Sequence, residues 1–286
     1  MSQARERFRQ VLAQPTCTVA ANIFDPLSAR IAQMLDYEVC FLSGSVGKVA
    51  NLWVPDIVLY NLSDAVDHCR RITRMADVSL MVDGEDGFGN TVNVRRTVQE
   101  LEAAGVSAIE IEDNIAPERF NAAAPGLHST AEQVWKLEAA VAARSDPTTV
   151  IVARTADLTY HPLDDALERM RAYAQTGVEA IRRVGLRTRA QLEAVHQATA
   201  LPLTVLSPPP DLMHDRPFLA AHGVRVLMLG NPAFAMAVKA IYDCFKHVKD
   251  GGVVEDLADQ QASADVLGAV NRTEEFVQWQ QRYLRA

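Results

Sequence analysis

Short apolar runs recur along the chain at fairly even intervals, and each is followed by a polar turn and a segment of helical periodicity. Apolar runs of this length, bounded by turn residues, are typical of buried strands. They cover residues 17–22, 38–44, 78–83, 107–113, 148–154, 179–185, 201–207 and 224–230. The pattern therefore predicts eight strands that alternate with helices.

The segments between these runs carry apolar residues at helical spacing, and several end in a glycine at the C-cap position. They cover residues 28–37, 64–76, 93–105, 131–145, 163–177 and 189–198. Strict alternation of strand and helix predicts parallel pairing with right-handed crossovers. Eight such units over roughly 210 residues fit a (β/α)8 TIM barrel better than an open doubly wound sheet, which is the second possibility.

No Pro-rich or Ser-rich linker interrupts the pattern, so we assign residues 1–286 to one domain. Residues 231–286 form a C-terminal helical extension with two amphipathic segments beyond what one barrel needs. Aromatic side chains at Phe276, Trp279 and Tyr283 suit this extension to packing on a neighbouring subunit.

Composition narrows the possible partners. The formal net charge is -8, and the arginines are scattered rather than gathered in a basic stripe, which disfavours nucleic acid and anionic lipid. No apolar run approaches the roughly 20 residues of a membrane span, and the first residues lack a signal peptide's apolar middle. We therefore expect a cytoplasmic protein.

The cysteines Cys17, Cys40, Cys69 and Cys244 lie far apart and form no CxxC pair. This spacing predicts reduced thiols that mostly fill the core, rather than a metal or redox site.

Acidic residues cluster where two neighbouring strands end. Asp83 ends the third predicted strand and Glu85 follows it, while Glu112 lies at the end of the fourth. Asp56, in the loop after the second strand, could join them. The active site of a parallel barrel lies at these carboxyl ends. Oxygen ligands without His or Cys predict Mg²⁺, or Mn²⁺, rather than zinc.

A second interpretation of the acids remains open, because carboxylates at strand ends also cap helices or pair with surface arginines. Arg154, at the end of the fifth predicted strand, could clamp a substrate carboxylate or instead hold the acidic cluster together as an ion pair. The small turn Ser43, Gly44 and Ser45 after the second strand has backbone N–H groups that can hold a carboxylate or an enolate oxygen.

These residues also carry a family resemblance. FDPLSARIAQMLDYEVCFLSGS, VDGEDGFGN, AIEIEDN and VIVART occur in this order and resemble the active-site segments of the phosphoenolpyruvate mutase/isocitrate lyase superfamily. The pattern SVxxxxxxxxPD from Ser45 to Asp56, and the later KAIYDC, are most similar to its oxaloacetate decarboxylase-like members. The resemblance covers about residues 18 to 247.

The resemblance implies a Mg²⁺-dependent barrel that exchanges terminal helices within a dimer, with dimers pairing into a homotetramer. It implies that Asp83 ligates the metal directly. Glu85 and Glu112 would reach it mainly through water, and Asp56 would support that shell. Glu85 stands where the family usually has Asp.

The resemblance also implies substrate contacts. Ser43, Gly44 and Ser45 would hold the substrate's carboxylate and keto oxygen, and Arg154 would bind its carboxylate.

The chain departs from the family pattern in two regions. The loop NIAPERFNAAAPGLHS lacks the Cys of the isocitrate-type lyases, and Glu118 replaces the Lys of phosphonopyruvate-type members. Pro208 and Asn231 stand where the decarboxylases have Tyr and His.

Together these features predict a carbon–carbon lyase that acts on a small 2-keto dicarboxylate, most simply oxaloacetate decarboxylation to pyruvate and CO2. The catalytic residues would be Arg154, Ser45 and Asn231, with Pro208 shaping the substrate pocket. Two alternatives stay open: another lyase or hydrolase for a different 2-keto or 2-hydroxy acid, and a metal-dependent binding protein without turnover.

Overall fold

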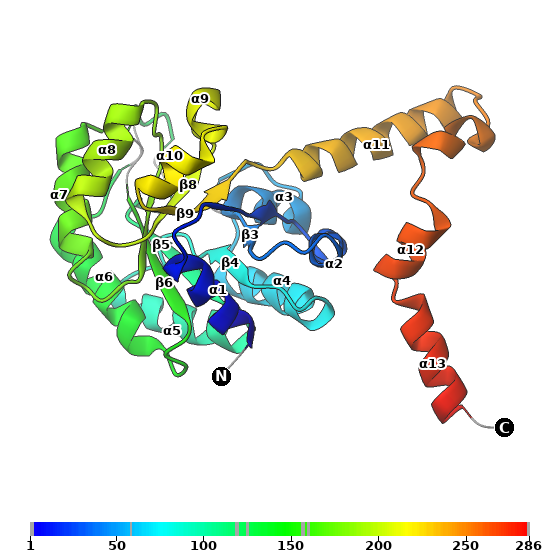
Figure 1. Ribbon diagram of the computed structural model, residues 1–286, viewed down its shortest axis with the longest axis horizontal. Coiled ribbons are helices and arrows are strands. Elements are labelled where there is room, and N and C mark those ends of the chain that lie inside the picture. The colour runs from blue at the N-terminus through cyan, green and yellow to red at the C-terminus, as the bar shows by residue number, and fades with distance from the viewer. Residues whose placement is uncertain are drawn as a thin grey trace.

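Nine parallel strands form one sheet whose ends are joined through a single short run of chain (Figure 1). In this computed structural model, β1 (Thr18–Val19) pairs with β9 (Val224–Met228), and β2 (Ala21–Asn22) pairs with β3 (Cys40–Leu42). Only Ala20 separates β1 from β2, and its amide donates to the carbonyl of Leu227. The predicted run 17–22 therefore closes the sheet, and the (β/α)8 barrel is confirmed.

The strands follow one another around the barrel in sequence order, so the open doubly wound sheet is wrong. Each predicted run contains a strand, and the first contributes two, which raises the expected eight to nine. The other strands are β4 (Leu80–Asp83), β5 (Ala108–Glu112), β6 (Val150–Thr155), β7 (Ala180–Arg183) and β8 (Leu203–Leu206). The structure describes residues 3–57, 59–117, 120–123, 126–155, 158 and 161–284.

Helices cover the outside of the barrel, and polar caps fix where several of them begin. The Asn61, Asn90 and Thr188 side chains each accept hydrogen bonds from the first turn of the helix that follows. The outer helices are α2 (Pro26–Met34), α4 (Leu62–Met75), α5 (Thr91–Ala103), α6 (Thr130–Ala143), α7 (Leu163–Tyr173), α8 (Arg189–Ala198) and α10 (Arg216–Ala221).

Two helices near the strand ends were not predicted. Helix α3 (Gly44–Leu52) begins directly after β3, and its two glycines give it weak intrinsic helix propensity. Helix α9 (Pro210–Met213) is a single turn after β8. Both lie at the end of the barrel where the candidate site was expected.

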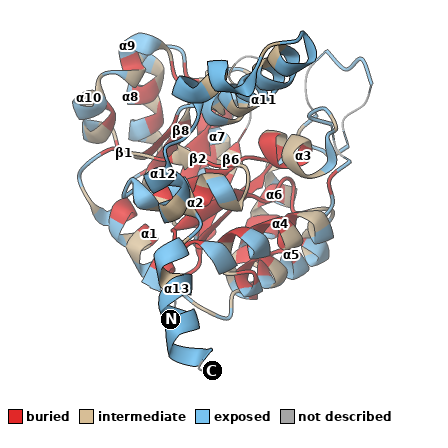
Figure 2. Ribbon diagram, turned by 90° about the vertical axis from the view of Figure 1, so that its right-hand side faces the viewer, coloured by how far each residue is buried: buried red, intermediate tan, exposed pale blue. Residues whose placement is uncertain are grey.

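The apolar core has two layers, inside and outside the sheet. Figure 2 shows buried residues on the strands and on the inward faces of the helices. Inside the barrel, Phe41, Met81 and Val152 pack with Phe8 from helix α1 (Gln3–Ala13). Helix α1 thus closes the amino end of the barrel interior.

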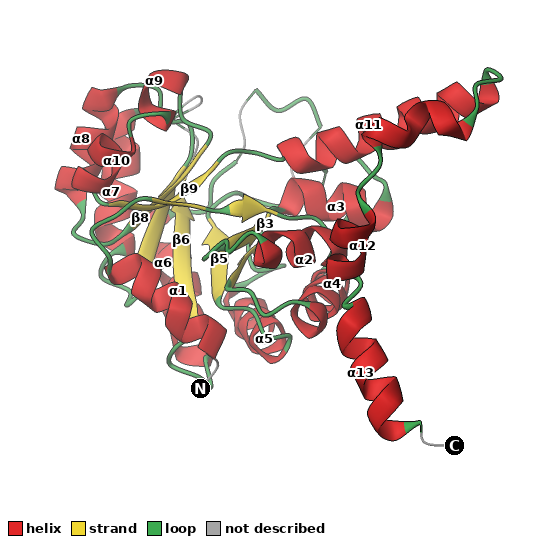
Figure 3. Cartoon of the chain, turned by 45° about the vertical axis from the view of Figure 1, so that its right-hand side comes forward, coloured by secondary structure: helices red, strands yellow, loops and turns green. Residues whose placement is uncertain are grey.

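The C-terminal extension reaches away from the barrel (Figures 1 and 3). It consists of α11 (Pro232–Lys249), the 3-10 helix η1 (Val254–Gln260), α12 (Ala264–Val270) and α13 (Thr273–Tyr283). No residue of these four helices is buried, and the extension includes Cys244, whereas the other three cysteines are buried thiols. The assignment of the whole chain to one domain stays a prediction.

Within the described part of the chain, no helix has both the length and the apolar character needed to cross a membrane.

The plug formed by helix α1 can be tested by mutation. Phe8 is fully buried, so Phe8→Ala leaves a cavity inside the barrel and should lower the free energy of unfolding by about 3–5 kcal/mol. Gln10→Ala, at an exposed position of the same helix, is the matched control and should change it by less than about 0.5 kcal/mol. Urea unfolding followed by circular dichroism measures both, and equal midpoints would contradict the plug.

A candidate active site at the carboxyl ends of the strands

The predicted acidic residues converge on one cavity at the carboxyl end of the barrel. Strand register brings them together, because Asp83 lies beside Glu110 and Glu112 lies beside Arg154 on adjacent strands. The cavity has a volume of about 700 Å³. Its lining includes seven of the predicted residues: Ser43, Ser45, Asp56, Asp83, Glu85, Glu112 and Arg154.

The turn after β4 is built against the backbone of β5. The Gly84 amide donates to the Glu110 carbonyl at 2.8 Å, and the Glu112 amide donates to the Glu85 carbonyl at 2.8 Å. A Cβ atom at Gly84 would lie 2.6 Å from the Glu110 carbonyl oxygen, so this approach requires glycine. Glu85 has a φ of 52°, a left-handed conformation that costs roughly 1 kcal/mol in a residue other than glycine. The hydrogen bonds to β5 therefore hold Glu85 at the cavity in spite of its strained backbone conformation.

Arg154 stands between the carboxylates that were expected to share a metal. Its Nη1 atom lies 3.0 Å from Asp83 Oδ2, 3.0 Å from Glu112 Oε2 and 3.4 Å from Glu110 Oε1. The structure thus shows the ion-pair role of Arg154 that the sequence left open. Among the described residues, no three acidic, His or Cys side chains form a group that could hold a metal ion.

Lys48 is a member of the cluster that the sequence analysis missed. Its Nζ atom lies 2.9 Å from Glu85 Oε1 and 2.9 Å from Asp56 Oδ1, and the residue is only 4% exposed. Helix α3 carries it one turn after Gly44, so the small turn and this lysine share a helix face. The spacing of SGSVGK could have identified it, had helix α3 been predicted.

The cavity holds more negative than positive charge. Among the described lining residues, four carboxylates face three cations: Asp56, Asp83, Glu85 and Glu112 against Lys48, Arg154 and Arg182. Burial, together with the charge of Asp83, raises the pKa of Glu85, and burial also raises the pKa of Glu112. Burial opposes ionisation of Asp83 as well, but nearby arginines hold its pKa below the usual range.

This donor set fits a hard divalent cation. Glu85 Oε1 is buried and has no hydrogen-bond partner among the described residues, although Lys48 is close enough for an ion pair. Gly44 leaves the necessary space, because a Cβ atom there would lie 2.3 Å from Glu85 Oε1 and 3.2 Å from Asp83 Oδ2. The donors are all oxygens, which Mg²⁺ and Mn²⁺ prefer.

The tertiary structure joins Asn231 to the small turn after β3. Asn231 Oδ1 accepts from the Ser43 hydroxyl at 3.3 Å, and Asn231 Nδ2 donates to Ser45 Oγ at 3.4 Å. Asn22, at the end of β2, donates to the same Oδ1 atom at 3.4 Å and was not predicted. Asn231 therefore orients both hydroxyls.

Two other predictions fall at the edge of the cavity. Leu206 lines it at the end of β8, whereas Pro208, two residues later, is buried, so the role of Pro208 stays a prediction. The loop after β5 contributes Ile115 and Phe120 to the lining. Glu118 lies outside the described residues.

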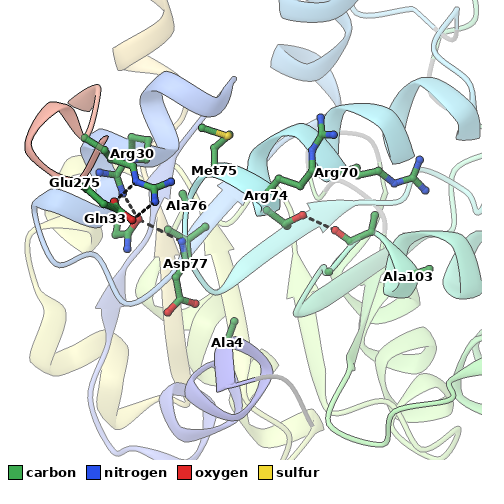
Figure 4. A pocket seen from close by; sticks show the side chains of 15 residues that line it. Ala4, Arg30, Gln33, Arg70, Arg74, Met75, Ala76, Asp77, Ala103 and Glu275 are labelled. Atoms are coloured by element: carbon green, nitrogen blue, oxygen red, sulfur yellow. Dashed lines mark hydrogen bonds and ion pairs between the residues drawn. The ribbon is translucent and has the colours of Figure 1, made fainter. Parts of the chain in front are cut away.

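A second cavity of about 700 Å³ lies at the opposite end of the barrel (Figure 4). Figure 4 shows Arg30, Gln33 and Glu275 on one side of it and Arg70 and Arg74 on another. Its lining contains none of the strand-end acids, so the cavity at the carboxyl end is the candidate active site.

Comparison with known proteins gives consistent similarities. The family model described as phosphoenolpyruvate phosphomutase matches residues 8–249. An oxaloacetate decarboxylase of Rhodopseudomonas palustris strain BisA53 is 41% identical over 94% of this chain and 92% of that protein. An oxaloacetate decarboxylase of Paraburkholderia xenovorans strain LB400 is 37% identical over 98% of this chain and 93% of that protein.

Solved structures share the fold over nearly the whole chain. Phosphonopyruvate hydrolase, in a complex with oxalate and Mg²⁺, superposes with a TM-score of 0.88 at 28% identity and covers 99% of both chains. The phosphoenolpyruvate phosphomutase of Streptomyces platensis subsp. rosaceus superposes with a TM-score of 0.88 at 25% identity, over 98% of this chain and 99% of that chain.

The space beside Gly44 can be tested by adding one methyl group. In Gly44→Ala the new Cβ displaces the carboxylates of Glu85 and Asp83, so the affinity for Mn²⁺ should fall roughly tenfold, about 1.4 kcal/mol. Gly47→Ala is the matched control on the same helix, because its Cβ would lie 3.6 Å from the nearest atom, in ordinary contact. Electron paramagnetic resonance of free Mn²⁺ measures both affinities, and identical values would refute the assignment.

Proposed function

This chain belongs to the phosphoenolpyruvate phosphomutase family, and on that basis we propose that it is a metal-dependent carboxy-lyase that converts oxaloacetate to pyruvate and CO2. The observation that carries the proposal is the convergence of Asp83, Glu112 and Arg154 with the small turn after β3 in one cavity. The decarboxylase relatives support this reaction because they are 37–43% identical, whereas the phosphonopyruvate hydrolase is 28% identical.

The proposed metal is Mg²⁺, with Mn²⁺ as a substitute, held directly by Asp83 and mainly through water by Glu85 and Glu112. Asp56 supports this set through Lys48, which contacts both Asp56 and Glu85. A bound divalent ion acts as a Lewis acid that draws electron density toward the keto oxygen of a 2-keto acid.

The small turn and Arg154 bind and orient the substrate. Ser43, Gly44 and Ser45 form the start of helix α3, where the helix dipole favours an anion, and the Gly44 amide already donates to the Asp83 carboxylate at 3.3 Å. The hydroxyls of Ser43 and Ser45 add hydrogen bonds to the carboxylate and keto oxygen. The Arg154 side chain is 20% exposed at the cavity, and its guanidinium can bind a carboxylate through two parallel hydrogen bonds.

The reaction itself needs no protein nucleophile. When the bond between the third and fourth carbons breaks, CO2 leaves. The electron pair of the broken bond stays behind and is shared by the third carbon and the keto oxygen. The Ser45 hydroxyl, oriented by Asn231, stabilises the developing oxyanion by a hydrogen bond. A proton must then reach the third carbon. Because an amide such as Asn231 does not transfer protons, we assign this proton to water.

The proposed assembly is a homotetramer of two dimers, and in each dimer the two subunits exchange terminal helices. Helix α11 supports it, because Met236, Tyr242 and Phe245 are all more than 60% exposed along 18 residues with no buried position. An apolar groove lined by Leu27 and Ile31 offers a surface of similar character. Exposed apolar area of this kind is typical of a subunit interface.

We further propose that the enzyme is cytoplasmic and that its partner is a small 2-keto acid.

The activity depends on Asp83. Purified protein with Mg²⁺ should form pyruvate from oxaloacetate well above the rate with Mg²⁺ alone, and Asp83→Ala should reduce kcat/KM by roughly 10³-fold. Asp67→Ala, a half-exposed acid on helix α4, is the control and should retain full activity. Nuclear magnetic resonance of the products distinguishes pyruvate from oxalate and acetate.

Each other product pattern identifies a different function. Oxalate plus acetate would show a hydrolase, and pyruvate from a different 2-keto or 2-hydroxy acid would show another lyase. Tight binding of oxalate by calorimetry, with no product from any substrate, would show a binding protein. Pyruvate at the metal-only rate would exclude decarboxylation.

The proposed assembly depends on the apolar face of α11. Met236→Glu combined with Phe245→Glu places charge on this face and should convert the tetramer into smaller species, measured by light scattering after size-exclusion chromatography. Lys249→Glu at the end of the same helix is the control and should keep the wild-type mass. A wild-type monomer would overturn the proposed assembly without affecting the proposed chemistry.

A further inference from the structure

We propose that the buried Glu110–Arg182 ion pair is a positioning device for Arg154, which gives its guanidinium an anionic partner when a divalent cation binds Asp83. The inference rests on the proposed function, because it concerns how the site changes when the metal binds. It assigns roles to two buried residues that have none in the proposed reaction.

The need for such a device follows from the contacts of Arg154. One nitrogen atom, Nη1, lies 3.0 Å from both Asp83 Oδ2 and Glu112 Oε2. A divalent ion that binds the Asp83 carboxylate places two positive charges beside the guanidinium, and their repulsion in a poorly solvated cavity is strong. Arg154 must therefore leave Asp83 Oδ2 before this carboxylate can ligate a metal.

Glu110 is placed to receive the displaced guanidinium. It is fully buried on β5, and its Oε1 atom already lies 3.4 Å from Arg154 Nη1. Its Oε2 atom is buried and has no hydrogen-bond partner among the described residues. The Glu110 carboxylate therefore has a free acceptor, and Arg154 can reach it by a small side-chain movement.

Arg182 keeps Glu110 in this position. Its Nη1 atom donates to Glu110 Oε1 at 2.6 Å, and its guanidinium carbon lies 5.0 Å from the centroid of the Phe41 ring. Arg182 lies beside Arg154 in the strand register, so both arginines approach Glu110 from adjacent strands. Because Arg182 is only 2% exposed, it is held under the cavity and stabilises the buried charge of Glu110.

In this arrangement Arg154 is the counterion of the acidic residues. The metal displaces Arg154 from them, but Arg154 stays within the site. In the cation-free chain Arg154 stabilises the crowded carboxylates of Asp83 and Glu112. After metal binding it remains anchored by Glu110 in the cavity, where it can bind the substrate carboxylate. Glu110 and Arg182 are positioning residues, since they act through Arg154.

A double-mutant cycle on Mn²⁺ affinity tests this role, because a cycle isolates the coupling between two residues. Glu110→Gln removes the anionic partner of Arg154 and should weaken Mn²⁺ binding roughly tenfold, since a hydrogen bond to a charged group contributes about 1.5–3 kcal/mol. In an Arg154→Gln background no guanidinium has to be displaced. The loss caused by Glu110→Gln should then be at least fivefold smaller, and any smaller difference overturns the inference. Electron paramagnetic resonance of free Mn²⁺ gives all four affinities without an activity assay.

A charge-neutral variant separates anchoring from the electrostatic field of Glu110. Glu110→Gln with Arg182→Met removes one negative and one positive charge, so a pure field effect predicts wild-type Mn²⁺ affinity. The anchoring role predicts that the Mn²⁺ affinity stays reduced, and recovery of the wild-type affinity would overturn the inference.

The double variant also avoids an unpaired buried arginine, and thermal unfolding confirms that each variant is folded. Failure of the wild type to bind Mn²⁺ would refute the proposed function itself, whereas normal wild-type binding with no coupling would refute only the anchor.

Discussion

Buried negative charge at the carboxyl end of the barrel dictates which side chains must surround it. Asp83 and Glu112 come from the ends of two adjacent strands and Glu85 from the turn after the first of them, and all are less than 10% exposed. Carboxylates this crowded need positive charge close by. The chain supplies Arg154 from the next strand and Lys48 from helix α3, and the proposed function adds a divalent ion.

The interior of the barrel is arranged to hold this charge in place. Helix α1 closes the amino end with Phe8, and apolar strand residues such as Phe41 and Val152 fill the space above it. The Glu110–Arg182 pair lies between this apolar layer and the cavity, with Arg182 over Phe41. Apolar packing beneath a paired charge keeps water from one side of the site, so the acids can be reached only through the cavity.

The site differs from the family pattern at two positions where a side chain could transfer a proton to the substrate. Asn231 stands where the resemblance implies a His, and it forms hydrogen bonds with Ser43 and Ser45 rather than pointing a titratable group at the cavity. The resemblance implies a Tyr at the position of Pro208. In this chain Leu206, two residues earlier, lines the cavity. These changes leave the binding of a keto acid intact in the proposed reaction, and they transfer the protonation of its third carbon to water.

The barrel could be predicted from the order of residues alone, because the alternation of apolar runs and amphipathic segments has a local period that is kept in the fold. The sequence also placed Asp83, Glu112 and Arg154 at strand ends, since the carboxyl ends of parallel strands all face one way. The contacts of these side chains, in contrast, depend on how distant parts of the chain meet in the fold. Helix α3 and therefore Lys48 were missed because glycine weakens the local helical signal. The partners Glu110 and Arg182 lie 72 residues apart. They meet only because closure of the sheet turns both into the same interior, where burial forces charges to pair.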